Sequence, residues 1–234
     1  MRARFGIWLG LLAGVSLADA APNLNGLWQT VNPPQALRTL NGGLPPMLPA
    51  AKQLYEQHLA ARQRHDLAFD NTLHCQPPGI PRIYLEGMPF EIQQQDDAIY
   101  LLYQWNRLFR VIEMNIGHDR QNIYGSTFLG FAVGHWAEAT LSIDTIGFND
   151  TTLLDSVGLP HSDDLHVAEL WTLQRGGQRI DALVTIEDDK TFTAPWQFRM
   201  QFRKLPTSAG IREDVCLERQ HQMADSSPMR PPAN

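Results

Sequence analysis

The stretch Trp196–Lys204, with the sequence WQFRMQFRK, alternates large apolar side chains with polar ones along its length. Every second residue from Trp196 to Phe202 is apolar, and the residues between them are Gln or Arg. Successive side chains of a β-strand point to opposite faces, so this period of two predicts a strand with one face in a core and the other in water. Such one-sided strands are typical of antiparallel sheets.

Segments of similar character precede this stretch, and turn residues separate them. They are short and rich in β-branched and aromatic residues, which predicts strands; their sequences are FEIQQQ, AIYLLYQW, LFRVIEMNI, STFLGFAVGHW and ATLSIDTIGF. Residues 175–178, RGGQ, predict a hairpin turn between two more strands, because Gly176 and Gly177 can adopt positive φ. The segment EDVCLER predicts a last strand that carries Cys216.

Helical spacing of apolar residues occurs once, over about residues 49–65, with Pro49 near the first turn. About ten short strands and one early helix, without regular alternation of the two, argue for a β-barrel or a β-sandwich. Short successive connections favour the barrel. We therefore predict an all-β fold, an antiparallel β-barrel with one N-terminal helix, in a single domain over residues 21–220.

The two ends of the chain differ from this domain. Arg2 and Arg4, the apolar run 5–17 and the small-residue site at 18–20 are typical of a secretory signal peptide, so residues 1–20 are excluded from the fold. Residues 221–234, which end in SSPMRPPAN, predict a disordered tail. We expect a periplasmic or secreted protein with no membrane anchor after signal cleavage. Its net charge of -6 and the absence of Lys/Arg runs argue against a nucleic-acid partner.

Cys75 and Cys216 are the two cysteines of the chain. In an oxidising compartment an isolated pair favours a disulfide. The alternative is two unpaired, buried thiols.

The NGLW sequence near the predicted mature N-terminus is similar to the Gly-x-Trp opening of lipocalins and related calycin barrels. The segments CQPPGIPR, GFND, PHSDDLHV and EDVCLER resemble a family of exported bacterial proteins of unassigned function, over about residues 75–218. The segment GHWAEATLS departs from that family's pattern. The resemblance implies a calycin-like barrel and no settled activity.

Residues Gly147 to Glu169 form a polar stretch that contains two histidines and several acids. A connection this long is uncommon in a compact barrel and is often functional. A histidine oriented by an aspartate can transfer protons near neutral pH. The candidate catalytic residues are His161, His166, Asp144, Asp150 and Asp163.

Two other interpretations of this stretch stay open. One is a metal site formed by the two histidines with Asp150, Asp163 or Asp164, although no HExxH-type helix supports it. The other is a purely structural role, in which His and Asp side chains tie the connection to the barrel. Strand periodicity places Glu169 with Val167 and Trp171, on the face opposite His166, which disfavours a His166–Glu169 metal pair. We predict no metal and no cofactor.

Aromatic residues on neighbouring strands predict a pocket for a small, largely apolar or aromatic molecule, although such residues also form ordinary cores. The candidate substrate-binding residues are Tyr103, Trp105, Arg110, Trp136 and Trp196. The leading hypothesis is a barrel that binds a small molecule and acts on it by His/Asp acid–base chemistry, as a lyase or an isomerase. The alternatives are a carrier without catalysis and an envelope interaction protein. The sequence does not indicate the oligomeric state.

Overall fold

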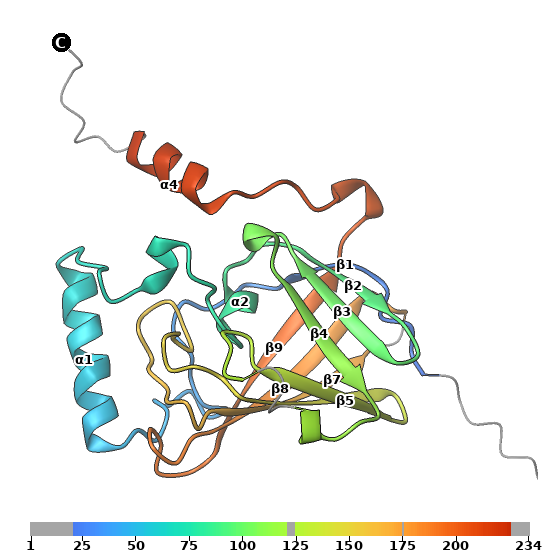
Figure 1. Ribbon diagram of the computed structural model, residues 1–234, viewed down its shortest axis with the longest axis horizontal. Coiled ribbons are helices and arrows are strands. Elements are labelled where there is room, and N and C mark those ends of the chain that lie inside the picture. Colours follow the sequence, from blue (N-terminus) through green and yellow to red (C-terminus); the bar gives the residue numbers. More distant parts are fainter. Residues whose placement is uncertain (1–20, 121–124, 175, 226–234) are drawn as a thin grey trace, which may run out of the picture.

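The computed structural model describes residues 21–120, 125–174 and 176–225 and contains a closed β-barrel of nine strands (Figure 1). The strands are β1 (Gly26–Thr30), β2 (Phe90–Gln94), β3 (Ala98–Tyr103), β4 (Phe109–Met114), β5 (Phe131–Ala137), β6 (Thr140–Ile146), β7 (His166–Leu173), β8 (Arg179–Glu187) and β9 (Trp196–Lys204). Strands adjacent in sequence are adjacent in the barrel, and β9 pairs with β1 to close it. The predicted all-β barrel is therefore confirmed.

One pairing departs from the antiparallel pattern. β4 and β5 run parallel and pair only over Ile112–Met114 and Ala132–Gly134. Residues 109–111 of β4 pair with β3 on one edge, but their other edge lies beyond the paired part of β5. At residues 109–111 the barrel wall therefore has no pairing between β4 and β5, and we call this unpaired stretch the seam.

Several short helices accompany the barrel. They are α1 (Pro49–Gln63), α2 (Arg82–Leu85), α4 (Cys216–Asp225) and the 3-10 helices η1 (Asn71–His74), η2 (Trp105–Arg107), η3 (His118–Arg120) and η4 (Thr207–Ala209). α1 matches the predicted N-terminal helix and, like α4, lies outside the barrel (Figure 1). No helix in the described part of the chain is long and apolar enough to cross a membrane.

Alternation along the strands fills the barrel interior. Phe198, Met200 and Phe202 of β9 are buried, whereas Arg199, Gln201 and Arg203 are exposed. α2 adds Tyr84 to this core, where its ring lies 5.9 Å from that of Trp171 and 5.3 Å from that of Phe202. The largest fully buried side chains are Trp28, Trp171, Tyr84, Phe90, Phe148 and Phe202.

The C-terminal segment differs from the prediction. EDVCLER forms an irregular stretch followed by the start of α4 rather than a tenth strand. Because β9 pairs with β1, the strand that precedes this segment has no free edge beside which a tenth strand could continue the sheet. α4 extends into the predicted tail as far as Asp225, and the rest of that tail and residues 1–20 lie outside the described residues.

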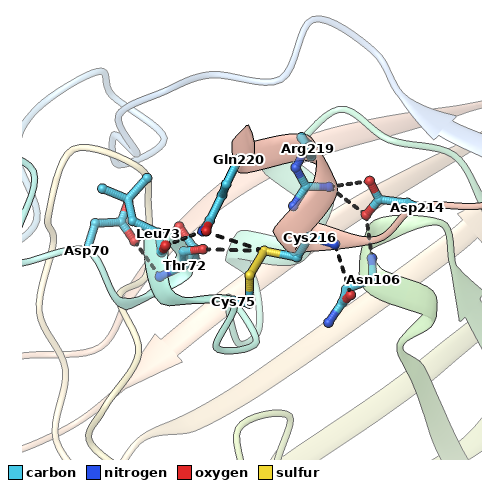
Figure 2. Close-up of a disulfide and its surroundings, with 9 residues drawn as sticks. All are labelled: Asp70, Thr72, Leu73, Cys75, Asn106, Asp214, Cys216, Arg219 and Gln220. Carbon is cyan, nitrogen blue, oxygen red and sulfur yellow. Dashed lines mark hydrogen bonds and ion pairs between the residues drawn. A yellow bond between two sulfur atoms is a disulfide. The ribbon is translucent and has the colours of Figure 1, made fainter. Parts of the chain in front are cut away.

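The disulfide between Cys75 and Cys216 is confirmed, with their Cα atoms 5.7 Å apart (Figure 2). Two contacts from η2 hold the C-terminal segment around Cys216. The backbone N–H of Asn106 donates to the Asp214 carboxylate at 2.6 Å, and the Arg219 guanidinium carbon lies 5.5 Å from the centre of the Trp105 ring. Asp214 also forms an ion pair with Arg219 (Figure 2). The C-terminal segment is thus fixed by a covalent bond to Cys75, the residue that follows η1, and by a hydrogen bond and a cation–ring contact to η2.

Candidate functional site

His166 and Asp144 lie together on the outer face of the barrel. They project from β7 and β6, and their strand neighbours Val167 and Thr145 are buried in the interior. His166 Nε2 contacts Asp144 Oδ1, and His166 Nδ1 lies 3.4 Å from Glu187 Oε2. The hydrogen bond between His166 and Asp144 raises the pKa of His166 and lowers the pKa of Asp144 from their ordinary values. The pair therefore favours an imidazolium beside a carboxylate.

A third residue, His118 of η3, joins this pair. Its Nδ1 lies 3.6 Å from Asp144 Oδ2, and its Nε2 lies 3.2 Å from the Asp144 carbonyl oxygen. Its ring also packs edge-on against Phe131, with 5.9 Å between the ring centres. The sequence did not identify His118, because the connection between β4 and β5 has no motif that indicates a site.

His161, in contrast, is buried in the connection between β6 and β7. Its Nδ1 lies 2.8 Å from the Ser162 carbonyl oxygen, and its Nε2 lies 2.6 Å from Thr152 Oγ1. A carbonyl can only accept, so Nδ1 carries the proton and Nε2 accepts from the Thr152 hydroxyl. Burial lowers the pKa of His161, which suits this neutral state. Within the described residues, no contact joins His161 to His166 or Asp144.

The other acids of the connection make turn and surface contacts. Asp155, which is fully buried, accepts hydrogen bonds from the backbone amides of Leu37, Val157, Gly158 and Leu159. Asp150 is exposed, and Asp163 is exposed in an ion pair with Lys190 at 2.8 Å. The Ser162 hydroxyl donates to Asp188 and not to a histidine, so Ser162, His161 and Asp188 do not form a nucleophilic triad.

The five candidate substrate-binding residues separate into different regions. Trp196 packs in the core against Phe192 and Phe198, Trp105 lies beneath Arg219, and Trp136 is partly buried against the core. Tyr103 and Arg110 lie together inside the barrel. Of the five candidates, Tyr103 and Arg110 are therefore the two that the structure places close to each other.

Arg110 is the centre of a buried polar cluster in the barrel interior. Its Nη2 lies 2.8 Å from Glu169 Oε1, and the two side chains are 2% and 0% exposed. Arg110 also donates to the Tyr84 hydroxyl at 2.7 Å and to the Thr145 hydroxyl at 2.6 Å. Trp171 Nε1 donates to Glu169 Oε2 at 3.1 Å. Burial opposes the charge on Arg110, but the combined effect of Glu169, Tyr84 and Tyr103 outweighs it and raises the pKa of Arg110.

A groove of about 600 Å³ lies on the outer surface where β4 and β5 separate. Residues 108–111 form one side and residues 127–131 form the other, with Tyr100 of β3 and Pro77 adding to the lining. Its apolar lining includes Leu108, Phe109, Val111, Phe128, Leu129 and Phe131. Of the five residues that the sequence predicts to line a pocket, Arg110 is the one that lines this groove.

Phe131 connects the groove to the pair of His166 and Asp144. Phe131 lines the groove, and its ring packs against the ring of His118, which lies beside Asp144. His118 and Asp144 do not themselves line the groove, and the Phe131–His118 ring contact is what connects them to its lining. Across residues 21–120, 125–174 and 176–225, no group of three or more His, Cys, Asp or Glu side chains is arranged to hold a metal ion.

No protein-family model matches this chain, and no curated protein matches it either. The barrel is compatible with the calycin-like resemblance of the NGLW segment. Trp28 of that segment is fully buried, donates from Nε1 to the Leu24 carbonyl at 2.8 Å, and has Lys204 Nζ 5.4 Å from its ring centre. It thereby ties the start of the barrel to the end of β9.

Proposed function

We propose that the protein binds a small, largely apolar molecule in the groove at the β4–β5 seam. The observation that carries the proposal is the groove itself, which has the volume and the apolar lining of a small-molecule site. Phe109 supports it further, because 63% of this large apolar residue is exposed on the groove. A ligand that covers Phe109 gains the free energy of burying that surface.

Two matched variants test this binding. Phe109→Asp places a charge on the groove, whereas Leu170→Asp places the same charge at a residue that is 43% exposed on β7 and does not line the groove. We expect 2-methylnaphthalene, followed by its fluorescence, to bind the wild type and Leu170→Asp, and to bind Phe109→Asp at least tenfold more weakly. Equal binding to both variants, or none to the wild type, overturns the proposal.

A second candidate function is acid–base chemistry by His166 and Asp144 on a molecule held in this groove. The chain of contacts from Phe131 through His118 to Asp144 favours it. A His/Asp pair can remove and return a proton without a metal, as lyase and isomerase reactions require. The alternative is a carrier that uses the groove alone.

Proton exchange distinguishes the enzyme from the carrier. Small aromatic ketones with acidic C–H bonds are incubated with protein in D₂O, and deuterium incorporation is measured by mass spectrometry. An acid–base enzyme exchanges at least one of them faster than buffer, and His166→Gln loses the acceleration. Equal rates in the wild type and His166→Gln would mean that His166 does not catalyse the exchange.

We also propose that the protein is exported and works in the periplasm or outside the cell. The disulfide supports an oxidising compartment. The mass of the mature protein, measured without reductant, tests this: we expect cleavage after Ala20 and an oxidised Cys75–Cys216 pair. An intact N-terminus in fractionated cells contradicts export.

A further inference from the structure

Three buried polar atoms of the Arg110 cluster have no hydrogen-bond partner in the part of the chain that the structure describes. They are Arg110 Nε, Glu169 Oε1 and the Tyr103 hydroxyl oxygen. Glu169 Oε1 is ion-paired with Arg110 Nη2, but the geometry is not that of a hydrogen bond. The three atoms are chemically different: Nε–H donates, the carboxylate oxygen accepts, and the hydroxyl does either.

The groove reaches this cluster at the seam. Arg110 lines the groove and is also the centre of the cluster. Gly130, on the opposite side of the groove, lies directly against Thr145, the residue that accepts a hydrogen bond from Arg110. A Cβ at Gly130 would lie 2.7 Å from Thr145 Cγ2, so the wall here has no room for a side chain. Arg110 is therefore the residue that the apolar groove and the buried polar cluster share.

We infer that the groove takes an apolar molecule that carries a hydroxyl group, and that Arg110, Glu169 and Tyr103 bind this hydroxyl at the inner end of the seam. The inference rests on the proposed function and adds the class of ligand. The apolar body lies between β4 and residues 127–131, and the hydroxyl points into the barrel.

The charges of the cluster favour a ligand hydroxyl over a carbonyl, a carboxylate or an ammonium group. A ligand hydroxyl accepts from Arg110 Nε–H and donates to Glu169 Oε1, which satisfies both atoms. A carbonyl group has no hydrogen to donate, so Glu169 Oε1 keeps its ion pair with Arg110 but gains no hydrogen bond. Arg110 and Glu169 already neutralise each other, so a ligand carboxylate or ammonium would add a buried charge that has no counter-charge of its own. Hydrogen bonds to charged groups are the stronger ones, and an unpaired buried polar group has a substantial cost, so the hydroxyl contributes both affinity and specificity.

A matched pair of probes tests this assignment. 2-Naphthol and 2-methylnaphthalene have similar shapes and differ in the hydroxyl. We expect the wild type to bind 2-naphthol roughly tenfold more tightly, which is the effect of one hydrogen bond to a charged partner. Tyr103→Phe keeps the buried ring and removes only the hydroxyl, and we expect the preference for 2-naphthol over 2-methylnaphthalene to fall several-fold.

The control is Tyr55→Phe, which removes the hydroxyl of another buried tyrosine, on α1 outside the barrel. It keeps the full preference for 2-naphthol. If the wild type binds both probes equally, the three polar atoms hold an internal water only, and this inference fails while groove binding stands. If neither probe binds, the proposed function fails as well.

Discussion

Strands β6 and β7 carry two charged clusters, one on each face of the same sheet. Inside the barrel, Glu169 of β7 pairs with Arg110, beside Thr145 of β6. Outside, His166 of β7 pairs with Asp144 of β6. The inner charges are almost fully buried, whereas the side chains of His166 and Asp144 are 31% and 37% exposed. The difference in exposure predicts that the inner cluster controls stability and that the outer pair is free to titrate.

The physical reason is the cost of leaving a charge unpaired. In the interior, water cannot replace a lost partner, so the remaining charge bears its full desolvation cost. At the surface, water solvates whichever charge remains, and salt screens it. Removing one partner of a charged pair should therefore lower the free energy of unfolding more inside the barrel than on its outer face.

The largest expected effect is that of Glu169→Gln. It keeps the shape of the side chain but leaves the Arg110 guanidinium buried without its counter-charge, which should lower the free energy of unfolding by about 3–5 kcal/mol. Urea unfolding followed by tryptophan fluorescence measures it. The control is Glu187→Gln, the same change beside His166 on the outer face, which we expect to cost less than about 1 kcal/mol. Equal losses in the free energy of unfolding for the two variants would mean that the buried pair contributes no more to stability than the outer contact.

The next effect concerns a single hydrogen bond of a threonine hydroxyl on each face of β6. Thr145→Val removes the hydroxyl that accepts from Arg110, and should destabilise the protein by about 1–3 kcal/mol because a guanidinium N–H is left buried and unpaired. Thr140→Val removes an outer-face hydroxyl that contacts Thr172 at 3.0 Å, where water can substitute, and should cost about 0.5 kcal/mol. The same urea titration compares them. A larger loss for Thr140→Val would reverse the assignment of the two faces.

Strand periodicity alone predicts on which face of the sheet Asp144, His166 and Glu169 lie. The sequence ATLSIDTI places Asp144 with Ser142 and Ile146, and LHVAELWTL separates His166 from Glu169, as the structure has them. The pairing of β6 with β7, which brings Asp144 beside His166, follows from two neighbouring antiparallel strands. Local patterns of this kind need no knowledge of distant residues.

The buried cluster could not be predicted in the same way. Arg110 meets Glu169 only because the barrel closes across a parallel β4–β5 pairing, and no local pattern indicates that pairing. Tyr84 reaches the cluster from α2, which has four residues and no detectable periodicity. His161, in turn, was a reasonable catalytic candidate by residue type, and its contacts with Thr152 and Ser162 depend on the path of an irregular connection.

The outer pair should make stability depend on pH. The folded pKa of His166 is raised, so its contribution is complete below the ordinary value of 6.5 and is lost as the pH rises through the folded pKa. The pKa of Asp144 is lowered, so its contribution is complete above 3.8 and is lost as the pH falls through the folded pKa. Because both side chains are about one-third exposed, we expect less than about 1 kcal/mol in total.

Urea unfolding between pH 5 and 9, together with NMR titration of the imidazole, measures this dependence in the wild type and in His166→Gln, with the pH range chosen to bracket the ordinary pKa of histidine. His166→Gln should lose the decline in stability above neutral pH. The matched substitution His161→Gln should leave that decline in place, because His161 is neutral in the folded protein. A wild-type His166 pKa at or below the ordinary value would contradict the ion pair.

The smallest expected effect is that of Asp163→Asn, at a candidate catalytic residue. The hydrogen bond from Lys190 lowers the pKa of Asp163, but the side chains of both residues are more than half exposed. Lys190 also contacts Asp164 at 3.0 Å, so it keeps an acidic partner after the substitution. We expect no measurable change in unfolding or in 2-methylnaphthalene binding, and no change in deuterium exchange. A loss of exchange with stability unchanged would return Asp163 to the catalytic set, because a solvated surface pair has no other means of affecting the reaction.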